Sequence, residues 1–176
     1  MREKLLILAG LMIAFMMAGC LSSSQEGGLN ETSNITGQGQ NDAGAEEVVL
    51  LFTAQAGLQN ATSEITKLRP DSVLMQVYGE CESDGKSTEW QYSFNSKEAM
   101  TGYVVSMPHP ERGVRNTQFS VRRTIPSGWV DSTSAASKCG HGGQCTLEMS
   151  GDSPVWTVIS DTDTCTINAL SNARVD

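Results

Sequence analysis

The stretch LRPDSVLMQVY, residues 68–78, contains the point at which the spacing of apolar residues changes. Before it, across residues 46–68, apolar residues recur every three or four positions, as in a helix with one apolar face: Val48, Leu51, Ala54, Leu58, Ala61, Ile65 and Leu68. Pro70 ends this helix, because the residue before a proline avoids helical backbone geometry. After Pro70 the spacing becomes two, which indicates strands. We therefore predict an α+β fold in which a long N-terminal helix packs on an antiparallel sheet.

Four strands with alternating apolar residues are expected after this helix, at residues 73–78, 89–94, 102–107 and 117–124. The pair Asp84-Gly85 predicts a hairpin between the first two. The prolines of MPHPERG, residues 107–113, cannot continue a strand and predict a long turn. On the second strand one face carries Trp90, Tyr92 and Phe94. We expect this aromatic face to lie in the core, opposite the apolar face of the helix.

A shorter version of the same order follows in the second half of the chain. A helix is expected after Trp129, with Asp131 or Ser132 as its N-cap, and then strands at residues 145–150, 154–159 and 164–170. Gly85 and Trp90 match Gly151 and Trp156, each pair being 66 residues apart. We interpret this as the duplication of a helix-plus-meander unit, residues 46–124 and 129–176, with the second copy truncated.

The second half also resembles a known family. GWVDSTSAASKC (128–139), followed by a strand, by PVWTVIS (154–160) and by TINALSNARV (166–175), resembles the ending of PepSY-like domains. Ile167, Ala169 and Val175 match the closing motif of that family, while its glycine is missing here. The resemblance implies a cystatin-like α+β fold. As a function it implies peptide binding or inhibition of an extracytoplasmic protease.

The N-terminus has the features of an export signal. Arg2 and Lys4 precede fifteen uncharged residues, 5–19, which as a helix span about 22 Å and fall short of the ~30 Å hydrocarbon core. This favours a cleaved signal peptide over a membrane helix. The residues Ala18 and Gly19 before Cys20 resemble the lipobox of prokaryotic lipoproteins. That resemblance implies cleavage after residue 19 and lipid attached to the thiol of Cys20.

Residues 20–45 are expected to form a tether and residues 46–176 a single domain. The tether is rich in glycine, serine and asparagine, so it cannot bury enough apolar surface to offset its conformational entropy. Two glycosylation sequons lie in it, at Asn30 and Asn34, and are equally well explained by its composition. A third sequon, at Asn60, falls in the predicted helix, which makes modification there less favoured.

The charge of the chain limits its partners. The full chain has a net charge of −8, and removal of residues 1–19 leaves ten Lys and Arg against nineteen Asp and Glu. Such an acidic chain is a poor nucleic-acid binder, and it is not attracted to anionic lipid. We therefore expect a covalently anchored protein on the cell membrane that faces outside the cytoplasm. Two or more acyl chains, such as palmitate, would hold it there stably.

Four cysteines remain beyond Cys20, and an even number in an exported protein indicates disulfides. We favour Cys139–Cys145 with Cys81–Cys165, because three glycines let the chain reverse inside CGHGGQC. The pairing Cys139–Cys165 with Cys81–Cys145 is the second choice. A zinc site made of these thiolates, with or without His141, is a weaker alternative because C-x5-C is wider than the usual zinc spacing.

No reaction centre is evident from the motifs. The two histidines, His109 and His141, lie in loops next to proline and glycine, and there is no G-x-S-x-G nucleophile motif or C-x-x-C redox pair. The acidic turns at residues 82–85 and 160–164 lack the ligand spacing of a calcium loop. We therefore expect no catalysis, no metal and no cofactor.

The expected function is a non-catalytic binding or inhibitory module for a peptide or an envelope protein. Strand addition at a sheet edge is the expected mode of binding. A structural surface lipoprotein without a dedicated ligand is the alternative, and a hydrolase or thiol-redox enzyme is the third hypothesis.

Overall fold

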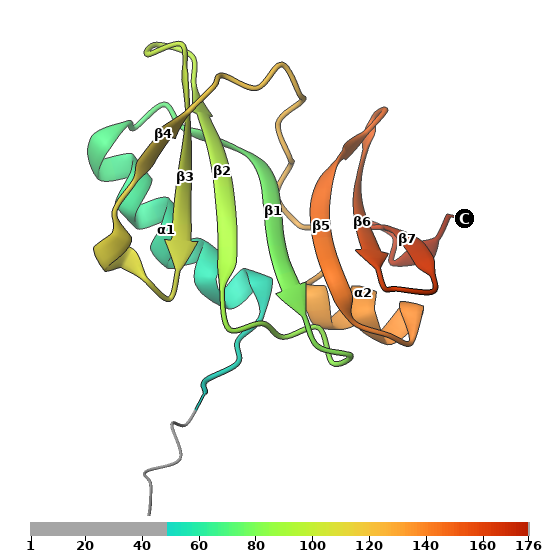
Figure 1. The fold of residues 1–176 in the computed structure, drawn as a ribbon. Helices are drawn as coiled ribbons and strands as arrows, with labels where there is room; N and C mark the ends of the chain where they lie inside the picture. The colour runs from blue at the N-terminus through green and yellow to red at the C-terminus, as the bar shows by residue number, and fades with distance from the viewer. Residues whose placement is uncertain (1–48, 176) are drawn as a thin grey trace, which may run out of the picture. The chain divides into compact units, whose positions relative to one another are not determined.

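The computed structural model describes residues 49–175, which form an α+β fold with one antiparallel sheet (Figure 1). The helices are α1 (Ala54–Leu68), α2 (Ser132–Cys139) and the short 3-10 helix η1 (Pro110–Arg112). The strands are β1 (Val73–Cys81), β2 (Trp90–Ser96), β3 (Thr101–Met107), β4 (Arg115–Thr117), β5 (Gly143–Ser150), β6 (Ser153–Ile159), β7 (Thr164–Asn168) and β8 (Ala173–Arg174).

The eight strands follow the order β4-β3-β2-β1-β5-β6-β7-β8, and every neighbouring pair is antiparallel. The first strand of each half, β1 or β5, therefore lies at the centre of the sheet, and the later strands extend outward in both directions. Both helices lie behind the same face of the sheet (Figure 1). The α1 helix contacts β2 and β3, and α2 contacts β6 and β7.

The core confirms the predicted aromatic face. Trp90 and Tyr92 are fully buried and Phe94 is 3% exposed. In the register of β2 and β3 these residues lie opposite Met107, Val105 and Tyr103, which are also buried. Burial of each large side chain of this kind contributes about 1.5–3 kcal/mol. The alternation of apolar residues, which is visible in the sequence, thus selects the face of the sheet that the helices cover.

The start of the first helix differs from the prediction. The helix begins at Ala54 rather than at residue 46, and it is not N-terminal in the chain. Thr53 is the N-cap, and its hydroxyl accepts a hydrogen bond from the Ala56 amide. Phe52 is extended instead and exchanges two backbone hydrogen bonds with Ser87. The helix cannot extend past Thr53 because the Phe52 carbonyl already accepts from the Ser87 amide and the Trp90 indole.

The predicted strand at residues 117–124 is wrong for most of its length. Only β4, which ends at Thr117, is a strand, and Val121 is 97% exposed. The segment that follows leaves the edge of the sheet and crosses to α2 (Figure 1). Its arginines 122 and 123 form ion pairs with Glu148 and Asp152 of the second half. Its Ile125 amide donates to the Leu74 carbonyl, and these contacts replace strand pairing.

Both edges of the sheet are short strands. The last predicted strand ends at Asn168 rather than at residue 170, and the chain then turns back to form β8. The edge strands β4 and β8 pair with only three and two residues of their neighbours. Short edge strands limit the backbone groups that another chain could pair with.

Candidate functional site

A groove lies between α1 and the segment that follows β3. Its volume is about 460 Å³. The residues that line it are mostly apolar or small: Leu50, Phe52, Ala56, Gly57, Asn60, Ser63, Glu64, Met107, Pro108 and Pro110. Cavities of this size with a few polar groups are typical ligand sites. It is therefore the candidate functional site in the described part of the chain.

The floor of the groove depends on Gly57. A Cβ atom at this position would overlap the hydroxyl of Tyr92 and would stand 3.0 Å from the Phe52 ring. Glycine therefore lets α1 approach β2 closely, and Tyr92 reaches past it to donate a hydrogen bond of 2.6 Å to the Ala54 carbonyl. Burial, with a smaller contribution from the charge of Asp131, raises the pKa of Tyr92, so its hydroxyl remains a donor.

One rim of the groove is polar. Asn60, Ser63 and Glu64 line it from α1, whereas Met107 and the two prolines line it from the opposite wall. Glu64 is the only charged residue among the lining residues of this groove. Its carboxylate lies 2.7 Å from the ammonium of Lys67, one helical turn along, and both side chains are exposed. Exposed pairs of this kind contribute only about 0.2–0.5 kcal/mol, so Glu64 can accept another cation.

A run of exposed aliphatic residues leads into the groove. Val49, Leu50 and Leu51 are 61%, 76% and 42% exposed, and Phe52 packs against the core. Isolated exposed aliphatic residues are normal, but a continuous apolar patch next to a cavity indicates an interaction surface. The groove and this run are therefore treated together as one candidate interaction surface.

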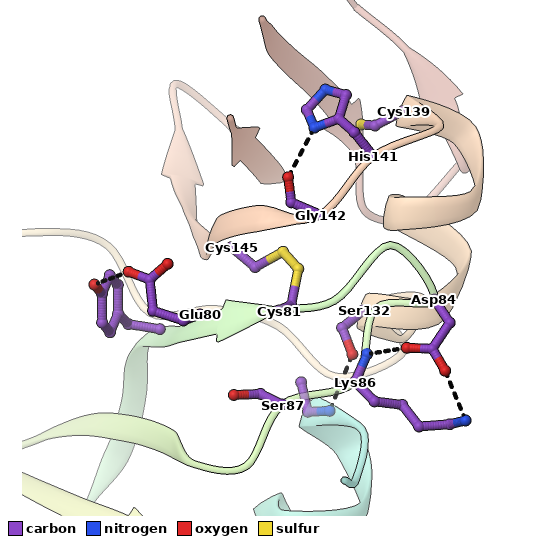
Figure 2. Close-up of a disulfide and its surroundings, with 12 residues drawn as sticks. Glu80, Cys81, Asp84, Lys86, Ser87, Ser132, Cys139, His141, Gly142 and Cys145 are labelled. Atoms are coloured by element: carbon purple, nitrogen blue, oxygen red, sulfur yellow. Dashed lines mark hydrogen bonds and ion pairs between the residues drawn. A yellow bond between two sulfur atoms is a disulfide. The ribbon is translucent and has the colours of Figure 1, made fainter. Parts of the chain in front are cut away.

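Residues 49–175 contain two disulfides, and their pairing corrects the favoured prediction. Cys81 is bonded to Cys145 and Cys139 to Cys165, with Cα separations of 5.9 and 5.6 Å. Figure 2 shows the first bond between the end of β1 and β5, with Cys139 at the end of α2. The expected pairs Cys139–Cys145 and Cys81–Cys165 are wrong, and the second-choice pairing is present.

The strand order explains this pairing. β5 and β6 lie between β1 and β7. At about 4.8 Å per strand, Cys81 and Cys165 are therefore roughly 14 Å apart, too far for a disulfide. The neighbouring strands β1 and β5 instead bring Cys81 and Cys145 together. Because α2 lies on β6 and β7, its last residue Cys139 reaches Cys165.

The N-termini of the two helices meet at Asp131, one of the two predicted N-caps. Its carboxylate accepts hydrogen bonds from the Ser132 amide at 2.8 Å and from the Gln55 amide of α1 at 3.0 Å. The Ser132 hydroxyl, which is fully buried, accepts from the Ala54 amide at 3.1 Å. One carboxylate thus caps both helices, and its negative charge is stabilised by both helix dipoles. We interpret this site as structural.

Neither histidine is a groove-lining residue, although His109 lies between the lining residues Pro108 and Pro110. His109 Nδ1 lies 3.0 Å from Glu111, and His141 Nδ1 lies 3.0 Å from the Gly142 carbonyl (Figure 2). The other ring nitrogen of His141 is 3.6 Å from Asp163 and has no hydrogen-bond partner among the described residues. Neither histidine is hydrogen-bonded to a serine, threonine or cysteine side chain within residues 49–175.

The four cysteines of the alternative zinc site all form disulfides, so their sulfur atoms are not thiolates. Within residues 49–175, no group of three or more His, Cys, Asp and Glu side chains is placed to hold a metal ion. The two acidic turns are held by their own contacts. Asp84 pairs with Lys86, and Ser160 accepts from the Asp163 amide. Turn formation thus accounts for the acidic residues.

Several predicted sites lie outside the described residues. Cys20, Asn30 and Asn34 are among them, as are the signal peptide and the tether. Asn60 lies in α1, is exposed, and lines the groove. Within residues 49–175, no helix combines the length and apolar character needed to cross a bilayer.

No protein family, curated protein or solved structure matches this chain. The geometry of the described residues is therefore the basis for a functional assignment.

The sequence patterns did not identify the groove. Its lining comes from two segments that are far apart in the sequence: residues 50–64 and residues 107–110. The one local signal was the glycine inside the helix pattern, which suggests close approach to a sheet. This signal indicates where α1 touches the sheet, but it does not reveal the cavity beside the contact.

Proposed function

We propose that this protein is a membrane-anchored extracytoplasmic lipoprotein whose domain binds a peptide segment in the groove beside α1. The observation that carries the proposal is the groove, which joins an apolar lining to a polar rim. Apolar side chains of a peptide would enter between Phe52 and Met107. The polar groups of Asn60 and Ser63 would hydrogen-bond to its backbone. The proposed activity is binding, without a catalytic step.

The groove is a better-supported binding surface than the edges of the sheet. Strand addition requires a row of unpaired backbone groups along an open edge. In the described sheet the two edge strands, β4 and β8, are only three and two residues long, so each offers a short row of such groups. A groove of about 460 Å³ can instead bury one or two large side chains.

We further propose that the domain arose by duplication and is PepSY-like and cystatin-like in architecture. Two equivalent details support the duplication. The Trp90 indole donates to the Phe52 carbonyl at 2.9 Å, and the Trp156 indole donates to the Val130 carbonyl at 2.8 Å. Phe52 and Val130 each directly precede the N-cap of a helix. In the sheet, β1 and β5 lie side by side, and the later strands of each half follow outward from them. Two copies of one unit, paired through their first strands, would produce this order.

The lipid anchor predicts a defined mature N-terminus. Mass spectrometry of protein purified from membranes should show a chain that begins at Cys20 with its mass increased by two or more acyl chains. Cys20→Ser should release the protein from the membrane, because one covalent site supplies the binding energy. Ser24→Ala serves as the control, since it changes a nearby residue and leaves Cys20 and both disulfides in place. An unmodified Cys20, or cleavage at another position, would contradict the anchor.

The groove can be tested by filling it. Ala56 is exposed on α1 and lines the groove, so Ala56→Trp should place an indole in the cavity. The probe is a neutral acetylated and amidated hexapeptide, GLFLXG with norleucine at X. Its binding can be followed by NMR of methionine methyl groups, because Met107 lines the groove. We expect a shift of the Met107 methyl signal in the unmodified protein. Ala56→Trp should weaken binding by at least about tenfold, which corresponds to 1.4 kcal/mol.

The matched control is Gln59→Trp, an exposed position of α1 that does not line this groove. The methyl signals of Met100 and Met149 report on sites away from the groove. Equal binding by Ala56→Trp and the unmodified protein would reject the groove as the site, as would shifts at Met100 or Met149 without a shift at Met107.

A further inference from the structure

The groove lining carries a single charge, and it is negative. Glu64 lies on the α1 side of the groove and is the only charged lining residue. On the opposite side, Glu111 directly follows Pro110 in η1 and is 68% exposed in its side chain. No lysine, arginine or histidine is among the lining residues of the groove. The only charge on the groove lining is therefore negative, and Glu111 places a second carboxylate directly after a lining proline.

Both carboxylates are available to an incoming cation. Glu64 pairs only weakly with Lys67, because both side chains are exposed. Glu111 faces His109, whose Nδ1 lies 3.0 Å from its carboxylate. Its own backbone amide, and then His109, keep the pKa of Glu111 below the usual value, so it is ionised at neutral pH.

Building on the proposed function, we infer that the groove takes a peptide segment in which apolar side chains stand next to a lysine or arginine. The apolar side chains fill the space between α1 and the Met107–Pro108 wall. The cation lies at the rim beside Glu64. An acidic segment is disfavoured, because its carboxylate would approach Glu64 with like charge. The net charge of −8 of the whole chain adds a longer-range attraction for basic partners.

The test compares three peptides that differ at one position. GLFLKG carries lysine, GLFLEG carries glutamate, and GLFLXG carries norleucine, all acetylated and amidated. Dissociation constants are measured from the Met107 methyl shift of the mature protein at low ionic strength. We expect the lysine peptide to bind roughly three- to tenfold more tightly than the glutamate peptide, as partly exposed ion pairs allow. Half-molar salt should reduce this ratio toward one, because the charges are screened.

Glu64→Gln should bring the ratio of the lysine and glutamate peptides below about twofold while the norleucine peptide binds as before. Glu98→Gln, at an exposed site outside the groove lining, is the control and should leave the ratio unchanged. Equal affinities for the three peptides, or tighter binding of the glutamate peptide, would overturn the charge inference while groove binding still held. The absence of any Met107 shift with all three would reject the proposed function itself.

Another occupant would also be visible in this experiment. Nuclear Overhauser contacts between the Met107 methyl and residues before Val49 in the free protein would assign the groove to the chain's own N-terminal segment. That result would overturn the inference of a separate basic peptide.

Discussion

Trp156→Ala is expected to lower the free energy of unfolding by about 3–5 kcal/mol, the range for removal of a large aromatic side chain from a core. Trp156 is fully buried on β6 and packs edge-to-face against both Trp90 and Trp129, with ring centroids 6.0 and 5.8 Å away. Its indole donates the hydrogen bond to the Val130 carbonyl that positions the start of α2. Alanine would therefore leave a cavity between the two halves and an unpaired carbonyl at the helix start.

The measurement is urea unfolding monitored by circular dichroism, with the disulfides intact. Trp156→Phe keeps most of the volume and loses only the hydrogen bond and part of the ring, so a smaller loss is expected. This variant provides a folded comparison if Trp156→Ala does not fold. Val121→Ala, at a 97% exposed position, should change stability by less than about 0.5 kcal/mol. A loss below about 1 kcal/mol for Trp156→Ala would contradict the central role of this side chain.

Removal of the Cys81–Cys145 disulfide is expected to have a similarly large effect. The bond closes a loop of 64 residues that includes all of β2, β3 and α2. In the chain-entropy account, release of a loop of this length costs about 4 kcal/mol. The Cys139–Cys165 bond closes 26 residues, and its removal should cost somewhat less, about 3.5 kcal/mol. The double variants Cys81→Ala/Cys145→Ala and Cys139→Ala/Cys165→Ala allow the comparison.

Both double variants should be compared with the unmodified protein by urea unfolding under oxidising conditions. Reduction of the unmodified protein should produce a loss at least as large as either double variant. Peptide mapping without reduction tests the pairing directly. A fragment that joins Cys139 to Cys145 would contradict the structure, and an unchanged stability in Cys81→Ala/Cys145→Ala would contradict the predicted magnitude.

The strands that the sequence predicted correctly are those with strong local alternation. β2 and β3 are examples, because every second residue from Trp90 to Phe94 and from Tyr103 to Met107 is buried. Side chains two apart in a strand always share a face, so this pattern does not depend on which strand lies beside it. The end of α1 near Pro70 was predictable for a similar reason, since the effect of proline on its neighbour is local.

The predictions from sequence were wrong where contacts between residues far apart in the chain outweigh the local conformational preference of a segment. Residues 49–53 fit a helical spacing, but the Phe52 carbonyl accepts hydrogen bonds from the Ser87 amide and the Trp90 indole instead. Residues 118–124 alternate like a strand, but they must cross from the edge of the sheet to α2 and are tied to Glu148 and Asp152 instead. In both segments a partner more than twenty residues away decides the conformation.

The sequence by itself determined the α+β class, most of the strands, the second helix with Asp131 as one of two candidate caps, and the burial of the aromatic face. These features follow from periodicity and capping, which involve residues a few positions apart. Only the tertiary structure decided the disulfide pairing and the groove. The position of β5 beside β1 brings Cys145 to Cys81 across 64 residues, and the packing of α1 on β3 brings Glu64 near Met107. No local pattern encodes such neighbours, because they result from how the elements assemble around one core.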